Sequence, residues 1–296
     1  MKQFLKNSLI SFVLIFAALF LLDILYTTVY TNAFPRNKTQ YILGLQEGEK
    51  IDYVFLGSSR VENTVISSKI KRLTGKSTLN LGTQAAKLED INLFLRLLID
   101  KKIAMKRVFV QLDYTYNINS NSEIVRSQSL PFIRNNPVIK NYLKRVDSNY
   151  YKNSYIPFYR YATNDYKLGF REFFASVINK KTKTNFNDGF VPLYGGIKDK
   201  SHSFSELPKV ILNSNRNITE IDSLCIANGI KVTYFCAPFC SGLLSNGYLS
   251  KLKKQVSDFE DFSSSVTNDS LFQSCGHLNK LGAEVFTKQI VNKLNL

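Results

Sequence analysis

The longest uninterrupted apolar stretch lies close to the start of the chain. Residues 9–22 read LISFVLIFAALFLL without a charge, and a further apolar segment follows Asp23 as far as residue 30. An α-helix rises about 1.5 Å per residue, so roughly twenty apolar residues can cross the hydrocarbon layer of a bilayer. The pattern predicts a membrane-spanning helix over residues 8–30, preceded by a short terminus of residues 1–7.

The flanks of this stretch predict its orientation. Lys2 and Lys6 precede it, which favours a cytoplasmic N-terminus, and Tyr26 and Tyr30 stand where an aromatic interface belt is expected. A cleaved signal peptide is the alternative. No small-residue cleavage motif follows the apolar core, so we favour an uncleaved anchor. Both interpretations place the remainder outside the cytoplasm, and the favoured anchor makes the protein a single-pass protein of the cell membrane.

After a polar connector at 31–50, apolar runs alternate with helix-periodic segments. The alternation predicts a parallel sheet with helices on both faces, in an α/β domain over 51–296. Glycine follows or ends the first two strands. The predicted order is strand 53–56 (YVFL), helix 64–73, strand 77–82 (STLNLG), helix 88–102 and strand 107–114 (RVFVQLDY).

The alternation of strands and helices stops at about 115–205. This segment is rich in Asn, Ser, Tyr and Lys, and we interpret it as an insertion or cap. Within it we expect helices at about 138–150 and 165–180 and a loop at 188–196. Regular elements then return. They are helix 206–228, strand 231–238, helix 247–257, a very short fifth strand at 270–272 and a final helix at 279–295.

Aromatic residues are abundant in the insertion and allow two interpretations. They could stack on sugar rings, or they could form the core of a cap subdomain. Alternation of aromatics with lysines is typical of a half-buried helix, so we favour the core. The residues concerned are Tyr150, Tyr151, Tyr155, Phe158, Tyr159 and Tyr161.

The chain is basic, with a net charge of +16 and a pI near 9.6. A net positive charge of this size favours contact with an anionic partner, such as phospholipid, acidic glycan or nucleic acid. The basic residues are spread along the chain without a nucleic-acid-binding motif, so we expect a bilayer partner and no nucleic acid. We also expect no cofactor.

Four cysteines are present, and two of them, Cys236 and Cys240, are spaced C-x3-C. With only two histidines in the chain and no zinc-type ligand pairs, we expect no metal site. Outside the cytosol one disulfide could form, although spacing does not define its pairing. Buried free thiols are the alternative.

Polar groups follow three of the predicted strands: Gly57-Ser58-Ser59, Gly82-Thr83-Gln84 and Asp113-Tyr114. In an open parallel sheet, ligands bind beyond the carboxyl ends of the strands. A serine nucleophile there needs a base, usually histidine. The chain offers His202, in the irregular region, and His277, where the predicted fifth strand meets the last helix.

These blocks, FLGSSR, LNLGTQAA and HLNKLGAEVFT, resemble those of the SGNH/GDSL hydrolase superfamily. The similarity is greatest to its membrane-anchored, GSS-containing bacterial members, of the DltD-like and polysaccharide O-acetylation type. It covers roughly residues 51–114 and 230–296, and it implies a flavodoxin-like three-layer sandwich and ester chemistry on acyl groups.

The resemblance also implies residue roles. Ser59 would be the nucleophile, with Ser58 in the place of the usual aspartate. His277 would be the base, and the backbone N–H groups of Ser59 and Gly82 would bind the oxyanion.

Two positions depart from the family pattern. The third block of the family often carries an oxyanion-binding Asn, where this chain has Asp113, and Asn117 is the candidate substitute. The acid that precedes the family's histidine by three residues is replaced by Ser274. A backbone carbonyl, Ser274 or Asp113 could therefore orient His277.

We expect a membrane-anchored extracytoplasmic esterase or O-acyltransferase that acts on acyl esters of a cell-surface carbohydrate or polymer. In the transferase version, a multi-spanning acyltransferase would be a partner, which the resemblance alone implies. The alternative is a catalytically inactive SGNH-fold protein that binds or assembles envelope glycan, which the missing acid favours. In a third interpretation Ser59 is simply a helix N-cap.

Overall fold

The computed structural model describes residues 1–197 and 206–296. The chain forms two compact units. We call residues 1–40 and 123–182 the helical unit, and residues 41–122 and 183–296 the α/β unit.

The α/β unit is built on a five-stranded parallel sheet in the order β2-β1-β3-β4-β5. This is the strand order of flavodoxin-like doubly wound folds. The three central strands bury their apolar residues on both faces, as parallel sheets covered by helices do. The strands are β1 (Lys50–Leu56), β2 (Thr78–Asn80), β3 (Ala104–Gln111), β4 (Lys231–Cys236) and β5 (Phe259–Asp261).

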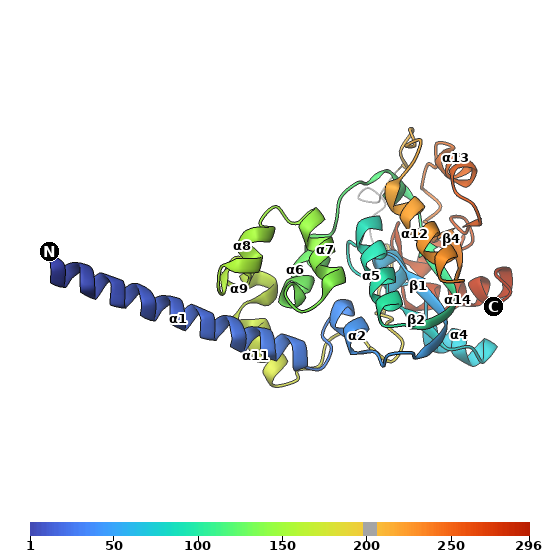
Figure 1. Ribbon diagram of the computed structural model, residues 1–296. Coiled ribbons are helices and arrows are strands. Elements are labelled where there is room, and N and C mark those ends of the chain that lie inside the picture. Colours follow the sequence, from blue (N-terminus) through green and yellow to red (C-terminus); the bar gives the residue numbers. More distant parts are fainter. Residues whose placement is uncertain (198–205) are drawn as a thin grey trace. The chain divides into compact units, whose positions relative to one another are not determined.

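Helices cover both faces of this sheet, as Figure 1 shows, with α5 and α12 packed together on one face and α4 and α14 on the other. Phe55, Phe109 and Phe235 fill the core next to the sheet. Within its described residues, the helices of the unit are α3 (Ser59–Glu62), α4 (Ser67–Thr74), α5 (Leu88–Asp100), η1 (Tyr114–Asn117), α12 (Arg216–Ala227), α13 (Tyr248–Gln255), η4 (Asp269–Leu271) and α14 (Lys280–Lys293). The helix α2 (Lys38–Gly44) lies where the two units join in the sequence.

The fifth strand is not where the hydrophobic pattern placed it. Strand β5 is an edge strand of three residues in which only Phe259 is buried, so no apolar run announces it. The segment predicted as a strand at 270–272 instead leads into β6 (Phe272–Ser274), which pairs antiparallel with β7 (His277–Leu278) as a separate two-stranded sheet.

The helix predicted at 206–228 also begins later than expected. Helix α12 starts at Arg216, because the side chain of Asn215 accepts a hydrogen bond from the Asn217 N–H and caps the helix there. Residues 206–215 before it are not helical.

The helical unit surrounds the C-terminal part of α1 (Lys2–Asn32). The helix predicted at 138–150 is present as α7 but ends four residues earlier, at Val146, whereas the helix predicted at 165–180 is divided into two shorter ones, α10 and α11. The helices of the unit are α6 (Glu123–Ser129), η2 (Leu130–Phe132), α7 (Pro137–Val146), α8 (Tyr150–Tyr155), α9 (Tyr159–Ala162), α10 (Asp165–Leu168) and α11 (Phe170–Val177).

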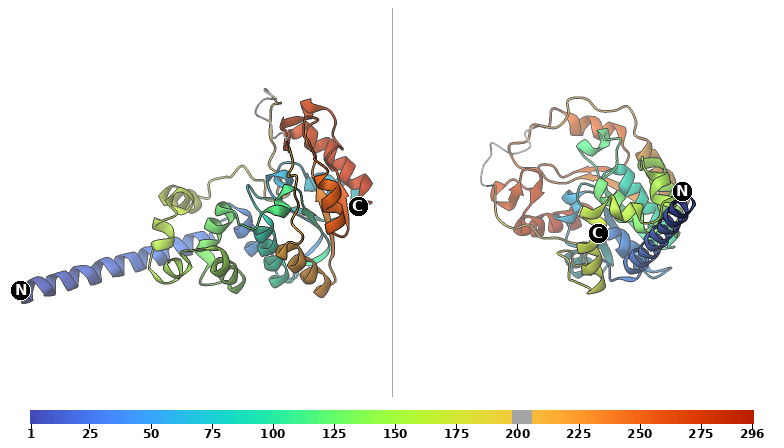
Figure 2. Two further views of the ribbon diagram at one scale, coloured as in Figure 1. Left: turned by 90° about the horizontal axis from the view of Figure 1, so that it is seen from above. Right: turned by 90° about the vertical axis from the view of Figure 1, so that its left-hand side faces the viewer.

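Helix α1 is long and apolar enough to cross a membrane, and its N-terminal two thirds extend beyond the other helices of the unit (Figure 2). The surroundings of α1 change at Asp23, the first buried residue of the helix. The Asp23 carboxylate is buried and is bound by the Arg160 and Arg134 guanidinium groups, each at 2.8 Å, and by the N–H of Phe158. From Asp23 onward, one side of α1 is therefore part of a protein core.

Tyr26 and Tyr30 belong to this core. Tyr26 stacks on Phe173 with ring centroids 4.1 Å apart, and Tyr30 stacks on Tyr161. Both tyrosines are buried, so they do not form the interface belt that their sequence position suggested.

The aromatic residues of the expected insertion divide between core and surface. Tyr150 and Tyr161 are buried, as a subdomain core requires, whereas Tyr151 and Tyr155 are exposed.

Candidate active site

The turn after β1 is shaped by Gly57. A Cβ atom at this position would lie 2.4 Å from Cγ2 of Val61 and 2.7 Å from Cβ of Gln111. A larger residue would collide with these side chains. Only glycine therefore lets the chain pass from β1 into α3 so close to β3. This close packing explains why the buried strand ends on a glycine.

The two serines that follow have different tasks. Ser58 is buried and is the N-cap of α3, since its Oγ accepts a hydrogen bond from the Arg60 N–H. Its backbone N–H and its hydroxyl both donate to Oε1 of Gln111 on β3, at 3.0 and 2.8 Å. Ser58 therefore ties the turn to the sheet, and the interpretation of Ser59 as the N-cap is wrong.

Ser59 points the other way, toward the only histidine of the described residues. Its Oγ lies 2.7 Å from Nε2 of His277, which is 218 positions away in the sequence. On the other side of the ring, Nδ1 of His277 lies 3.0 Å from Oγ of Ser274. A neutral imidazole that donates from Nδ1 to Ser274 can accept the Ser59 proton at Nε2.

The surroundings keep this imidazole neutral. Burial, and then the positive charge of Arg60, lower the pKa of His277 from 6.5 to about 4. At neutral pH the ring therefore holds the lone pair that a general base needs.

A buried ion pair lies next to the serine turn. Nε of Arg60 lies 2.9 Å from Oδ2 of Asp113, and both side chains are almost completely buried. The same guanidinium donates to the carbonyl oxygens of Gly276 and Ala237, at 3.1 and 2.5 Å, and lies over the ring of Phe239. Arg60 thus joins the serine turn to the loop after β4 and to the residue before His277.

Arg60 was not singled out from the sequence. The available signal was an Arg directly after Gly-Ser-Ser together with an Asp at the end of a neighbouring strand. Opposite charges at adjacent strand ends are brought together by a parallel sheet.

A disulfide fixes the hairpin that carries the histidine. Cys240, in the loop after β4, is bonded to Cys275, between Ser274 and His277 in the hairpin. The Cys240 N–H also donates to the Cys275 carbonyl at 3.0 Å. Cys225 and Cys236 are buried free thiols, so both sequence alternatives for cysteine occur in this structure.

The three predicted oxyanion donors differ in whether they already have a hydrogen-bond partner. The Ser59 N–H has no hydrogen-bond partner within residues 1–197 and 206–296. The Gly82 N–H donates to Oδ1 of Asn80 at 2.8 Å. The Asn117 amide is held by Val210 O and Leu212 N, so the structure does not bring it to the serine–histidine pair.

Gly82 has a packing role that is visible in the structure. A Cβ at this position would lie 2.1 Å from the Glu62 nitrogen, so glycine lets the loop after β2 approach the backbone of α3.

Of the candidates for orienting His277, the structure brings Ser274 to the ring. Asp113 is engaged elsewhere: its carboxylate pairs with Arg60 and accepts hydrogen bonds from Gln111 Nε2 and the Thr115 N–H. His202, the other histidine of the chain, lies outside the described residues.

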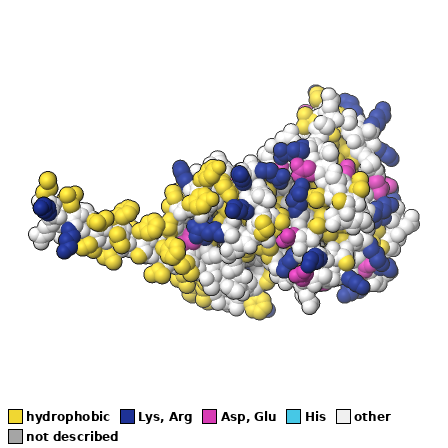
Figure 3. Space-filling model, in the orientation of Figure 1, with side chains coloured by type: hydrophobic (Ala, Val, Ile, Leu, Met, Phe, Trp, Pro, Cys, Tyr) yellow, Lys and Arg dark blue, Asp and Glu magenta, His cyan; other side chains and the backbone are white. Residues whose placement is uncertain are grey.

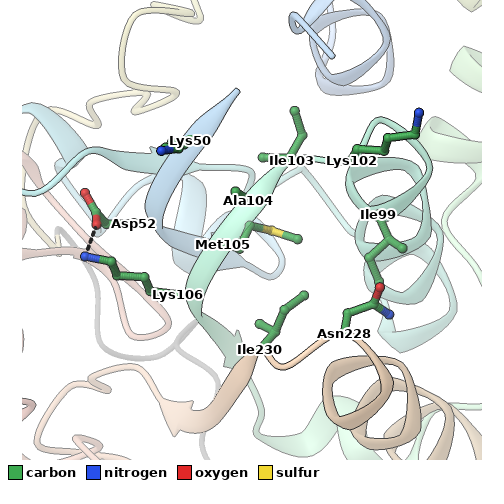
Figure 4. Close-up of a pocket in the computed structure, with 10 residues that line it drawn as sticks. All are labelled: Lys50, Asp52, Ile99, Lys102, Ile103, Ala104, Met105, Lys106, Asn228 and Ile230. Atoms are coloured by element: carbon green, nitrogen blue, oxygen red, sulfur yellow. Dashed lines mark ion pairs between the residues drawn. The ribbon is translucent and has the colours of Figure 1, made fainter. Parts of the chain in front are cut away.

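A cavity of about 730 Å³ lies at the opposite end of the sheet. Figure 4 shows it beside the start of β3, with an ion pair between Asp52 and Lys106 at its margin. Lys50 and Ala104, which line it, stand at the amino ends of β1 and β3. The cavity is therefore separate from the Ser59–His277 pair at the carboxyl ends of the strands.

No protein-family model matches the chain, and no curated protein matches its sequence.

Proposed function

We propose that the protein is a membrane-anchored, extracytoplasmic serine esterase or O-acyltransferase of the SGNH type, acting on acyl esters of a cell-surface carbohydrate or polymer. The observation that carries the proposal is the 2.7 Å contact between Ser59 Oγ and His277 Nε2 at the carboxyl edge of the sheet. A hydroxyl within hydrogen-bond reach of a neutral imidazole is the arrangement of an activated nucleophile.

The chemistry follows from the geometry of this pair. Ser59 Oγ attacks the ester carbonyl while its proton passes to Nε2 of His277. The resulting oxyanion meets the Ser59 N–H, which has no partner among the residues that the structure describes, and a preformed donor of this kind stabilises a transition state by about 3 kcal/mol. The imidazolium then returns the proton to the leaving alkoxide, and an acyl-serine remains.

The acyl group leaves the serine by the reverse sequence. Water would complete a hydrolysis, and a sugar hydroxyl would complete a transfer, with His277 accepting the proton of either. In the transfer version a multi-spanning acyltransferase would supply the acyl group across the membrane.

Three features support an extracytoplasmic location. Lys2 and Lys6 precede the apolar part of α1, which favours a cytoplasmic N-terminus. Helix α1 has the length and composition of a membrane span. The Cys240–Cys275 disulfide is of a kind that persists in oxidising compartments.

A non-catalytic glycan-binding or assembly protein is the second candidate. It is favoured by the partner of His277 Nδ1, which is the Ser274 hydroxyl instead of a carboxylate. Without a negative charge on that side, the imidazolium formed during catalysis is less stabilised, and loss of the acid from a triad can lower kcat by about 10⁴.

The two candidates are separated by chemistry at Ser59. In the full-length protein in detergent, we expect Ser59→Ala to lower p-nitrophenyl acetate hydrolysis by at least about a thousandfold and to abolish labelling by a fluorophosphonate. Ser264→Ala, at an exposed serine, is the matched control and should retain both.

Equal hydrolysis and equal labelling of wild type and Ser59→Ala would rule out Ser59 as the nucleophile. Absence of labelling in the wild type would favour the binding protein.

A further inference from the structure

We propose that the helical unit carries a second membrane contact, in which the exposed face of α11 inserts into the interface of an anionic bilayer beside α1. This inference rests on the membrane anchoring proposed above, but it does not depend on the chemistry of Ser59.

Helix α11 carries one apolar stripe, because Phe170, Phe173, Phe174 and Val177 follow one another at helical spacing. At one edge of this stripe Phe173 packs against α1, where it stacks on Tyr26. The rest of the stripe forms an open face, since Phe170 and Phe174 are 69% and 52% exposed and Val177 and Ile178 are about as exposed. The apolar stripe of a surface helix normally packs against other apolar groups, so the open face lacks a cover.

The position of this face indicates what covers it. Helix α11 contacts the part of α1 that follows Asp23, and α1 itself exposes Leu21, Ile24 and Leu25 on its outer side. Figure 3 shows hydrophobic side chains continuing from α1 onto the helices packed around its C-terminal part. The open face is thus continuous with a surface that a bilayer would surround.

Charged residues around the face match an anionic headgroup layer. The shallow groove along α11 is bordered by four basic side chains, Arg36, Arg171, Lys180 and Lys181. Its one acid, Glu172, is paired with Arg36 at 2.5 Å. Apolar side chains flanked by basic ones are typical of helices that lie in a membrane interface.

Helix α8 of the same unit repeats this composition. Tyr151 and Tyr155 are exposed and stack on one another, with Ile156 exposed after them and Lys152 between them in the sequence. Tyrosine is enriched at membrane interfaces, where its ring lies among headgroups. The helical unit therefore presents interfacial residues from two helices.

The absence of tryptophan from the chain allows a direct test. Single-tryptophan variants of the full-length protein, Phe174→Trp, Phe16→Trp and Ile226→Trp, are reconstituted into vesicles of equimolar phosphatidylcholine and phosphatidylglycerol. Phe16 lies in the apolar part of α1 and reports on the anchor, while Ile226 is an exposed apolar residue of α12 in the α/β unit.

We expect the emission of Phe174→Trp to shift to shorter wavelength and to be quenched by phospholipids brominated near the glycerol. Acrylamide should quench it severalfold less than it quenches Ile226→Trp, which stays in water. Vesicles of phosphatidylcholine alone, or high salt, should weaken the lipid quenching of Phe174→Trp because the headgroup attraction is lost or screened.

Introducing Phe170→Glu into Phe174→Trp should lower the lipid quenching severalfold, because a carboxylate on the same face opposes insertion. Phe16→Trp should be quenched by lipid whether or not Phe170→Glu is present. No effect of Phe170→Glu on Phe174→Trp would overturn the proposal.

The other outcomes are equally decisive. If Phe16→Trp is quenched by lipid and Phe174→Trp resembles Ile226→Trp, the second contact is wrong and the anchor stands. If Phe16→Trp is not quenched, the anchor fails and the docking proposal fails with it. A blue-shifted Phe174→Trp without lipid quenching would mean that a second copy covers the face, and would also overturn the proposal.

Discussion

Ser58 and Ser59 are neighbours with the same side chain, yet their surroundings separate their tasks. The Ser58 hydroxyl is buried. It donates a hydrogen bond to Gln111 and accepts one from the Arg60 N–H, which together fix its position. The Ser59 hydroxyl faces an imidazole and is partly accessible. Of the two hydroxyls, only that of Ser59 contacts an imidazole, and the difference comes from hydrogen bonding, because the residue type is the same at both positions.

The pKa of His277 leads to a prediction about pH. If the imidazole is the base, kcat/KM for an ester should fall at acid pH, where the ring is protonated, with an apparent pKa near 4 instead of the usual value of about 6.5. A pH profile of ester hydrolysis by the full-length protein, corrected for uncatalysed hydrolysis, measures this apparent pKa. A midpoint near 6.5 would contradict the desolvated environment of His277.

The same shift affects stability in a defined direction. Because the folded-state pKa is lowered, the unfolded chain binds a proton at this residue between about pH 6.5 and pH 4, whereas the folded chain does not. The contribution of His277 to the free energy of unfolding is therefore largest above pH 6.5 and declines as the pH falls through this window.

Among the secondary-structure elements, the hairpin β6–β7 depends most on its connections. It is a short two-stranded sheet outside the main sheet, and such hairpins are marginal by themselves. Two links hold it in place, namely the Cys240–Cys275 disulfide and the hydrogen bond from Arg60 to Gly276. Because Ser274 and His277 belong to this hairpin, these links also hold the imidazole against Ser59.

The disulfide can be tested by removing it. Replacing both Cys240 and Cys275 with Ser should lower the free energy of unfolding by about 2–4 kcal/mol, because the cross-link no longer restricts the unfolded chain. Denaturant unfolding followed by circular dichroism, with and without dithiothreitol, measures the effect.

Cys225→Ala is the control, since it removes a buried thiol and no cross-link. It should keep the sensitivity of the wild type to dithiothreitol. Identical unfolding of the wild type in both conditions would show that the disulfide does not form.

The hydrophobic pattern predicted the central elements well and the peripheral ones poorly. Strands β1, β3 and β4 were found because they are buried on both faces and appear as continuous apolar runs. Strand β5 was missed because an edge strand with one buried residue carries almost no pattern. Helix α12 was predicted too long because its start depends on the cap made by Asn215.

Considered as a whole, the molecule uses α1 for two purposes. Its N-terminal part has the composition of a membrane span, and its C-terminal part from Asp23 is a structural member of the helical unit. Asp23, where the two parts meet, binds α1 to α9 of the helical unit through Arg160, which is completely buried. Removing one partner of such a pair leaves an uncompensated buried charge, at a cost of about 3–5 kcal/mol.

Truncation tests this dual use. A chain lacking residues 1–32 should lose the fold of the helical unit, because Arg160, Tyr161 and Phe173 lose their partners on α1. A chain lacking residues 1–21 keeps Asp23 and those partners and serves as the matched control. Limited proteolysis within 123–182 should cut the shorter chain rapidly and the control slowly, and equal resistance would refute this role of α1.

Local sequence signals were sufficient for the class of fold, the apolar N-terminal helix and the pairing of Ser59 with His277 as candidates. Each depends on short-range patterns, such as apolar runs, glycine-ended strands and a serine at a strand end. The Arg60–Asp113 ion pair, the Cys240–Cys275 bond and the burial of Asp23 could not be read in this way. They join residues far apart in the chain, and folding brings such residues together because a parallel sheet and a packed helical unit determine which distant side chains become neighbours.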